Sequence, residues 1–197
     1  MIKRGFDILI STLGIVLLAP VFVTIALLVR IDSPGPAFFR QERIGRHFRP
    51  FKILKFRTMM QAKSDDLRLT VGEDSRITAV GRWLRRSKLD ELPQLFNVVA
   101  GDMSLVGPRP EIPRYVEMFR KDYEELLTVR PGITDTASIV YRDEVAILGR
   151  AHDAEQVYVT MILPEKIRLA KNDLRRSSVF VDIFIIVKTL MGTRRHG

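Results

Sequence analysis

The feature that most constrains this chain is an uncharged run near its amino terminus, from Ile8 to Val29. At about 1.5 Å of rise per residue, a helix over these 22 residues would match the roughly 30 Å hydrocarbon core of a bilayer. The run is long for a removable signal peptide, and no small-residue cleavage pattern follows it. We therefore expect the segment to be retained as a membrane anchor.

Two features indicate how this anchor meets the membrane. Pro20 lies near the middle of the run, where a proline removes a backbone hydrogen bond and kinks or breaks a helix. Both flanks are basic, so the positive-inside tendency exports neither end; the flanking residues are Lys3, Arg4, Arg30, Arg40, Arg43, Arg46 and Arg49. We expect a re-entrant helix that breaks at Pro20 and enters and leaves on the cytoplasmic side. A kinked helix that spans the bilayer is the alternative.

A dense turn cluster, Asp32 to Pro36, separates the anchor from the rest of the chain. We expect residues 1–32 to form the anchor and residues 33–197 to form one small cytosolic domain with membrane-associated helices. An apolar content of 46% can supply a hydrophobic core for that domain. The net charge of +9 predicts anionic partners, and the absence of cysteine excludes disulfides and Cys-ligated metals.

The predicted fold class is mixed α/β and mainly helical, with one small β-hairpin. Two β-prone runs, Phe38 to Ile44 and Phe51 to Phe56, flank a Gly45-centred turn and predict the hairpin. Helical spacing predicts a helix over 80–99 that is interrupted near Lys88, with Pro93 opening its second part. Further helices are expected over 113–129, 154–172 and 178–191, with loop-rich sequence before residue 144 and a loop or short helix over 61–74.

The last of these helices carries an apolar stripe, made by Val179, Phe180, Ile183, Phe184, Val187 and Leu190. Such a stripe either packs in the core, which is the commoner case, or lies on the membrane, and the sequence leaves both open.

The strongest candidate for chemistry is the adjacent carboxylate pair Asp90 and Glu91. Acidic residues at a helix start are usually caps, so the pair is informative only through its context. Arg82, Arg85, Arg86 and Lys88 precede it, and Arg109 follows between two prolines. Carboxylates beside cations stay ionised and can hold Mg²⁺, while arginines at helix-start amides suit a phosphate. A carboxylate can also attack phosphorus as a nucleophile.

Beyond these residues, several longer motifs run through the chain in order. They are Lys3-Arg4-Gly5-Phe6-Asp7, Ser33-Pro34-Gly35-Pro36, Gln41-Glu42-Arg43-Ile44-Gly45, the stretch from Phe51 to Met59, the stretch from Leu89 to Val98, the stretch from Gly101 to Glu111, and Pro131-Gly132-Ile133-Thr134. Together they resemble the bacterial sugar transferases, also called monotopic phosphoglycosyl transferases.

The resemblance implies a ping-pong phosphoglycosyl transfer. Asp90 would attack the β-phosphate of a UDP-sugar, release UMP and carry the phosphosugar to undecaprenyl phosphate, which starts glycoconjugate synthesis. Glu91 would complete a catalytic dyad and assist deprotonation of the acceptor, and Mg²⁺ would bridge Asp90 and the diphosphate. Arg85 and Arg109 match family arginines near the phosphates; the same phosphate-binding role extends to Lys55, Arg57 and Arg142.

Two departures from the family pattern affect these expectations. The family breaks its re-entrant helix at a Ser-Pro pair, whereas this chain has Ala19-Pro20, so Pro20 must break the helix alone or with Ser11 or Thr24. Asp135-Thr136-Ala137-Ser138 stands where many members have Gly-Trp-Ala-Gln, which leaves the sugar open. The extra transmembrane helices of larger relatives are absent, so we expect a minimal catalytic unit.

Two other function classes compete with an enzyme. The first is a single-pass membrane protein whose basic cytosolic domain binds lipid headgroups or partners; it leaves the Asp90 and Arg109 clusters unexplained. The second is nucleic-acid binding, which a retained membrane segment argues against.

The expected location is the bacterial inner membrane, with the site on its cytoplasmic face and membrane lipids as contacts. Oligomeric state has no sequence signature here, and a homodimer remains open.

Overall fold

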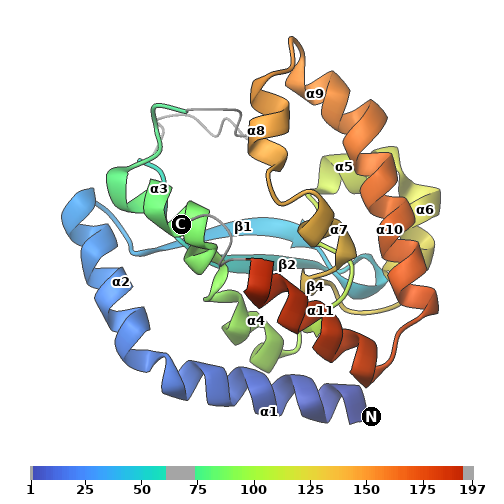
Figure 1. Cartoon of the computed structure of the whole chain (residues 1–197), viewed down its shortest axis with the longest axis horizontal. Coiled ribbons are helices and arrows are strands. Elements are labelled where there is room, and N and C mark those ends of the chain that lie inside the picture. Colours follow the sequence, from blue (N-terminus) through green and yellow to red (C-terminus); the bar gives the residue numbers. More distant parts are fainter. Residues whose placement is uncertain (1, 61–73, 193–197) are drawn as a thin grey trace.

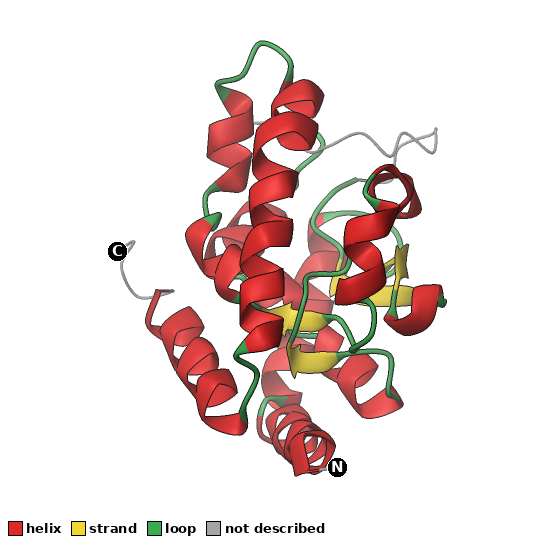
Figure 2. Ribbon diagram, turned by 90° about the vertical axis from the view of Figure 1, so that its right-hand side faces the viewer, coloured by secondary structure: helices red, strands yellow, loops and turns green. Residues whose placement is uncertain are grey.

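The computed structural model describes residues 2–60 and 74–192, and it is mainly helical, as predicted. The expectation for 61–74 lies outside these residues except at Asp74. Two helices joined at a bend lie along one edge, and two small sheets pack between helices from both halves of the chain (Figures 1 and 2). The helices and strands below are described in chain order.

The amino-terminal run forms two helices, α1 (Ile2–Leu17) and α2 (Ala19–Asp32), which meet at an angle of 63°. Pro20 lies in the first turn of α2, where a proline is tolerated, so the bend falls at Leu18 just before it. The Thr24 hydroxyl donates to the Pro20 carbonyl over 2.9 Å. Within the described residues no single helix is long and apolar enough to cross a membrane, but the bent pair together is (Figure 1).

The two ends of this bent pair are both tied to the rest of the protein. At the start of α1, Arg4 donates to the Val98 and Met103 carbonyls, and the buried Asp7 carboxylate accepts from the Ser104 hydroxyl over 2.7 Å. At the end of α2, the Asp32 carboxylate accepts from the Val80 amide over 3.0 Å. Both ends of the helix pair are therefore held by the same globular body, against which α2 also packs through Phe22, Ile25 and Val29.

The predicted hairpin is confirmed. Strand β1 (Phe38–Ile44) pairs antiparallel with β2 (Pro50–Phe56), so that Phe38 lies opposite Phe56, and a short 3₁₀ turn at Arg46–Phe48 joins them. A second, parallel pair of strands was not predicted: β3 (Ser104–Val106) and β4 (Gly132–Thr134). Only three residues form each strand, which is too short for a pattern with period two. A Cβ at Gly132 would lie 2.1 Å from the Gly107 nitrogen, so this pairing requires glycine.

The helical interruption near Lys88 is also confirmed. Helix α3 (Ala79–Ser87) ends where Lys88 takes a left-handed conformation with φ 58°, a 3₁₀ turn at Leu89–Glu91 follows, and α4 (Gln94–Ala100) ends at Gly101. Thr78 caps α3 by accepting from the Gly81 amide over 3.0 Å. Pro93 is the N-cap residue of α4, one position before its expected place.

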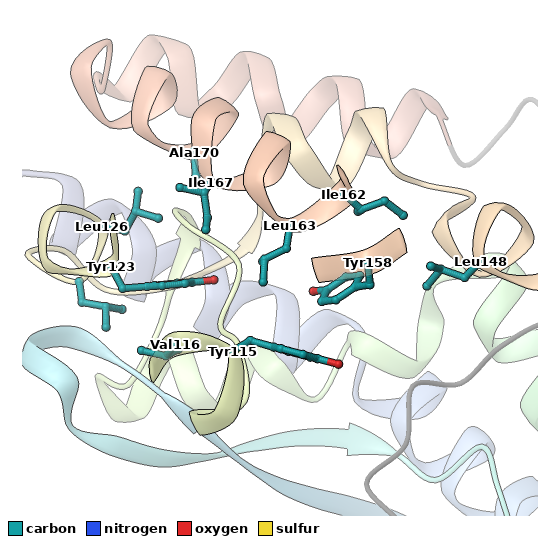
Figure 3. Close-up of a cluster of buried hydrophobic side chains, with 11 residues drawn as sticks. Tyr115, Val116, Tyr123, Leu126, Leu148, Tyr158, Ile162, Leu163, Ile167 and Ala170 are labelled. Atoms are coloured by element: carbon teal, nitrogen blue, oxygen red, sulfur yellow. The ribbon is translucent and has the colours of Figure 1, made fainter. Parts of the chain in front are cut away.

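The carboxyl-terminal half is more divided than the sequence predicts. The helix expected over 113–129 is split into α5 (Pro113–Met118) and α6 (Arg120–Leu126), and the loop-rich stretch contains β4, α7 (Thr136–Val140) and the start of α8 (Glu144–Gly149). The helix expected over 154–172 comprises α9 (Ala154–Val157), a π-helical turn at Tyr158–Ile162 and α10 (Leu163–Arg175). Buried side chains from these helices form the largest apolar cluster, in which Tyr115 and Tyr158 are in ring contact (Figure 3).

The apolar stripe of helix α11 (Val179–Gly192) does not pack in the core, which was the commoner of the two open cases. Its buried residues are Asp182 and Ile185, whereas Phe180 is 86% exposed and Phe184 64% exposed. A buried charge fixes the rotation of the helix, because the Lys3 ammonium on α1 donates to the Asp182 carboxylate. The stripe therefore faces away from the protein, beside the amino-terminal end of α1 (Figure 1).

Candidate functional site

The backbone between α3 and α4 presents the Asp90 and Glu91 side chains. The left-handed Lys88 reverses the chain after α3, and the 3₁₀ turn that follows carries both carboxylates. Leu89 and Leu92 pack against an apolar cluster that includes Phe22 of α2. The prediction of a helix start is right in outline, but the pair precedes Pro93 and α4, so the amides of α4 are not its partners.

Glu91 is held between two cations. The Lys55 ammonium on β2 donates to Glu91 Oε1 over 2.7 Å, and Arg109 donates through both terminal nitrogens, at 2.5 Å to Oε1 and 3.4 Å to Oε2. The Glu91 side chain is only 13% exposed. Burial raises the Glu91 pKa, but the charges and hydrogen bonds of Arg109 and Lys55 outweigh this effect. The net result is a pKa well below the ordinary range. Glu91 is therefore an ionised carboxylate and a weak base.

Asp90 has the opposite environment. It is 9% exposed, and its buried Oδ1 atom has no hydrogen-bond partner among the described residues. Burial first, and then the neighbouring Glu91 charge, raise the Asp90 pKa, while Lys55, Lys88 and Arg85 oppose the rise. A buried oxygen without a hydrogen bond costs free energy, and a carboxylate oxygen among cations can act as a nucleophile or as a metal ligand.

The cations around Asp90 come from separate parts of the chain. Arg85, on the last turn of α3, donates from Nε to the Thr58 hydroxyl over 2.9 Å, and burial lowers its pKa. Arg109 is fixed by its own backbone as well, since its amide donates to the buried Asp135 carboxylate over 3.3 Å. The structure thus brings together the side chains of five candidate residues, Asp90, Glu91, Lys55, Arg85 and Arg109.

Two predicted phosphate ligands lie elsewhere. Arg57 is 5% exposed, and its guanidinium donates to the Pro34, Ser33 and Val29 carbonyls at 2.5, 2.6 and 3.3 Å. The Arg57 side chain therefore binds the carbonyls at the carboxyl-terminal end of α2, and it is not free to bind a substrate. Arg142 lies against the end of α11, where a Cβ on Gly192 would come within 2.6 Å of its Nη1 atom. No contact joins it to Asp90 or Glu91 in the described part of the chain.

Sequence reasoning missed the residues that support this cluster. Asp135 accepts from the Ser138 amide and hydroxyl at 2.7 and 2.6 Å, so the departure from the family pattern at 135–138 forms the N-cap and first turn of α7. Glu111 lies deeper: it accepts from the Tyr158 hydroxyl over 2.6 Å and pairs with Arg43 and Lys166. Lys166 and Arg43, among other groups, lower the Glu111 pKa against the effect of burial. The Pro-Arg-Pro motif had pointed to Arg109 alone.

The donor set can also be tested for a divalent cation. Among the described residues, no three His, Cys, Asp or Glu side chains lie together as a protein-only metal site. Mg²⁺ does not need one, because it commonly binds through one or two carboxylates, water and substrate phosphates. Asp90 Oδ1 is buried and has no hydrogen-bond partner among the described residues, whereas the Glu91 oxygens are bound by Lys55 and Arg109. The residues fit a cation that is shared with a phosphorylated substrate.

The comparisons with known proteins agree on one family. The sequence profile of the bacterial sugar transferases matches residues 1–195. A UDP-N-acetylgalactosamine-undecaprenyl-phosphate N-acetylgalactosaminephosphotransferase of Aeromonas hydrophila is 38% identical over 193 residues, which cover 96% of this chain and 43% of the relative. A UDP-glucose:undecaprenyl-phosphate glucose-1-phosphate transferase of Escherichia coli K12 is 37% identical over 195 residues, covering 96% and 39%.

The lengths of these relatives differ. The chain spans about two fifths of the first two. The exopolysaccharide production protein ExoY of Sinorhizobium fredii is 37% identical over 186 residues, and there the match covers 86% of this chain and 82% of the relative. The profile match over nearly every residue, with these identities, shows that the chain belongs to the bacterial sugar transferase family.

Proposed function

We propose that this protein transfers a sugar 1-phosphate from a UDP-sugar to undecaprenyl phosphate and releases UMP. The relatives named above as undecaprenyl-phosphate sugar phosphotransferases support this reaction class. The observation that carries the proposal is the buried, unpartnered Oδ1 atom of Asp90, surrounded by the charges of Lys55, Lys88 and Arg85. A product linked to undecaprenyl diphosphate would begin a bacterial polysaccharide, which agrees with the name of ExoY.

In the first half-reaction the Asp90 carboxylate attacks the β-phosphorus of the UDP-sugar. A bond forms from Asp90 oxygen to the β-phosphorus, the bond from that phosphorus to the bridging oxygen breaks, and UMP leaves with the electron pair. In the second, a phosphate oxygen of undecaprenyl phosphate attacks the same phosphorus and releases Asp90. The aspartyl phosphosugar splits one displacement into two, each with a good leaving group.

The cations around Asp90 have a defined task in both steps. Charge accumulates on the phosphoryl oxygens during displacement, and fixed guanidinium and ammonium groups stabilise it without reorganising. We assign this to Arg85, Arg109 and Lys55. Glu91 keeps Arg109 and Lys55 in place, and its depressed pKa makes it a poor proton acceptor at neutral pH. This assignment differs from the base that the family resemblance implies.

We also assign a magnesium ion to Asp90 and the donor diphosphate. When bound, the ion would neutralise phosphate charge and orient the diphosphate. The Asp90 Oδ1 atom has no hydrogen-bond partner among the described residues, which supports the assignment. The remaining ligands would come from substrate and water.

For α1 and α2 we propose a re-entrant anchor, with the site on the cytoplasmic face of the inner membrane. Both ends of the bent pair hydrogen-bond to the same globular body, through Arg4 and Asp7 at one end and Asp32 at the other. A spanning helix would place its two ends on opposite sides of the bilayer and break one set. Leu9, Leu13, Val16 and Leu17 are at least half exposed along α1, which supports lipid contact near the bend.

The proposal is tested by UMP release from purified full-length chain with Mg²⁺, undecaprenyl phosphate and a panel of UDP-sugars. Wild type should turn over one donor, and Asp90→Asn should be inactive. Asp102→Asn should match wild type, because the Asp102 side chain is exposed and its hydrogen-bond partner is Asn97, which is not part of the cation cluster. Equal turnover in Asp90→Asn would remove the proposed nucleophile. No turnover with any donor would favour a protein that binds lipid headgroups.

A further inference from the structure

The structure also contains a pocket outside the Asp90 cluster. Its volume is about 280 Å³, and its walls come from the start of α1, β3, the segment before β4 and the connection between α10 and α11. Neither Asp90 nor Glu91 lines it. Three of its wall residues are arginines, Arg4, Arg46 and Arg130, contributed by α1, the hairpin turn and the segment before β4. We call this cavity the three-arginine pocket.

The backbone holds each of the three guanidinium groups in place. Arg4 Nη1 donates to the Val98 carbonyl over 2.8 Å, and Arg130 Nε donates to the Gly101 carbonyl over 2.7 Å. Arg46 Nε donates to the Thr128 carbonyl over 2.9 Å. An arginine has five N–H donors, so Arg46 and Arg130 each keep several for another partner. The groups are oriented before any ligand arrives.

Carboxylates in the described residues do not neutralise these arginines. None of the three forms an ion pair with a described carboxylate, whereas the nearby Lys3 pairs with Asp182. Asp7 is the carboxylate that acts on Arg130 by its charge, but its oxygens accept from the Ser104 hydroxyl and the Leu105 amide. Burial first, and then the charges of Arg4 and Arg46, lower the Arg130 pKa. Three carboxylates also line the pocket, but each has another partner: Asp7 as above, Asp182 with Lys3, and Asp173 with the Thr136 amide and hydroxyl. The four cations of the wall, Lys3 and the three arginines, exceed these three carboxylates by one charge, and the guanidinium groups keep N–H donors for an anion.

We propose that the three-arginine pocket binds a phosphate ester, and that its source is the headgroup of an anionic phospholipid. Guanidinium groups suit phosphate because their N–H donors pair with two oxygens at once. The volume exceeds that of a bare phosphate and leaves room for a glycerol or similar headgroup. This assignment of the source rests on the membrane attachment proposed above.

The surroundings of the pocket favour a lipid over a soluble ester. Lys3 and Arg4 line it, and Ile2, next to them on α1, is 82% exposed. Val181 and Asp182 line it from α11, and the adjacent Phe180 is 86% exposed. Ile2 and Phe180 thus belong to α1 and α11, two helices that border the pocket. A phospholipid whose acyl chains meet Ile2 and Phe180 could place its phosphate among the arginines.

The test measures binding by isothermal titration calorimetry to the full chain in a neutral detergent, without UDP-sugar or undecaprenyl phosphate. The probes are short-chain phosphatidylglycerol, short-chain phosphatidylcholine, glycerol 3-phosphate and inorganic phosphate. The variants are Arg46→Gln, which removes an exposed pocket arginine, and Arg49→Gln, which removes the same charge from the same turn outside the pocket. Arg130→Lys is a second pocket variant that keeps the charge and removes the planar donor fork.

We expect phosphatidylglycerol to bind wild type and Arg49→Gln equally, with affinity weakened about tenfold in Arg46→Gln and in Arg130→Lys, the scale of one charge-assisted hydrogen bond. Equal weakening in Arg46→Gln and Arg49→Gln would overturn the pocket. Phosphatidylcholine binding as tightly would overturn the anion requirement, and glycerol 3-phosphate or phosphate binding as tightly as the lipid would overturn the lipid source. Because no substrate is present, Asp90→Asn should bind phosphatidylglycerol like wild type, whatever becomes of the proposed reaction.

Discussion

Replacing Glu91 with glutamine tests how the site is held together. The amide keeps the shape of the side chain but removes the charge that pairs with Lys55 and Arg109. In wild type that carboxylate accepts one bond from Lys55 and two from Arg109. In Glu91→Gln the two cations would repel each other, and one amide hydrogen would face an N–H donor.

The cost follows from the burial of the three side chains. Breaking a fully buried ion pair by removing one partner costs about 3–5 kcal/mol. Lys55 and Arg109 are 20% and 30% exposed, so water recovers part of this. We expect the free energy of unfolding to fall by about 2 kcal/mol at neutral pH. For a chain of this size, this corresponds to a Tm lower by about 4–8 °C.

The same change has a signature in the pH dependence of stability. Because the folded-state pKa of Glu91 is depressed, its contribution is fully present above the unfolded pKa of about 4.5 and is lost as the pH falls through the lower folded pKa. Differential scanning calorimetry of wild type and Glu91→Gln should show the full Tm difference at pH 7 and a shrinking one below about pH 4.5. Equal Tm values at pH 7 would refute the ion-pair argument.

Three further substitutions test other parts of the account. Arg57→Gln should lower the free energy of unfolding by about 3 kcal/mol, because three carbonyls lose a buried cationic hydrogen-bond donor. Below the Tm, the KM for the UDP-sugar should stay unchanged. A raised KM with unchanged stability would return Arg57 to the substrate site. Gly81→Ala should cost about 2–3 kcal/mol in denaturant unfolding, since its Cβ would lie 2.1 Å from the Thr58 carbonyl oxygen; a neutral result would contradict that close approach. Lys3→Met should destabilise by about 1–2 kcal/mol by leaving the buried Asp182 unpaired, and a double-mutant cycle with Asp182→Asn should show coupling, so additive effects would argue against the contact between α1 and α11.

The sequence predicted those parts of the molecule that have a local cause. Pro20 and Pro93 indicated the two helix breaks because a proline acts on its own backbone, and the hairpin follows from two β-prone runs around a turn. Asp90, Glu91 and Arg109 became candidates because charged residues are concentrated around proline-marked turns. Lys55 was added through the family resemblance.

Other features depend on contacts between distant segments and leave little local trace. The parallel pairing of β3 with β4 joins residues 104 and 132, and three-residue strands carry no readable alternation. Arg57 was assigned to phosphate because its motif is basic, but its orientation toward the end of α2 is set by tertiary packing. The apolar stripe of α11 left core and membrane contact both open because its pattern does not say which side is covered, and the buried Asp182 decides that.

A covalent intermediate on Asp90 is the central claim, and intact-protein mass spectrometry tests it most directly. Wild-type chain is incubated with Mg²⁺ and its UDP-sugar without undecaprenyl phosphate, quenched in acid, and then digested to locate any adduct. The account predicts a mass increase of one phosphosugar on the peptide that contains Asp90, lost when undecaprenyl phosphate is added and absent from Asp90→Asn. UMP release with no adduct on that peptide, or an adduct that persists in Asp90→Asn, would contradict it.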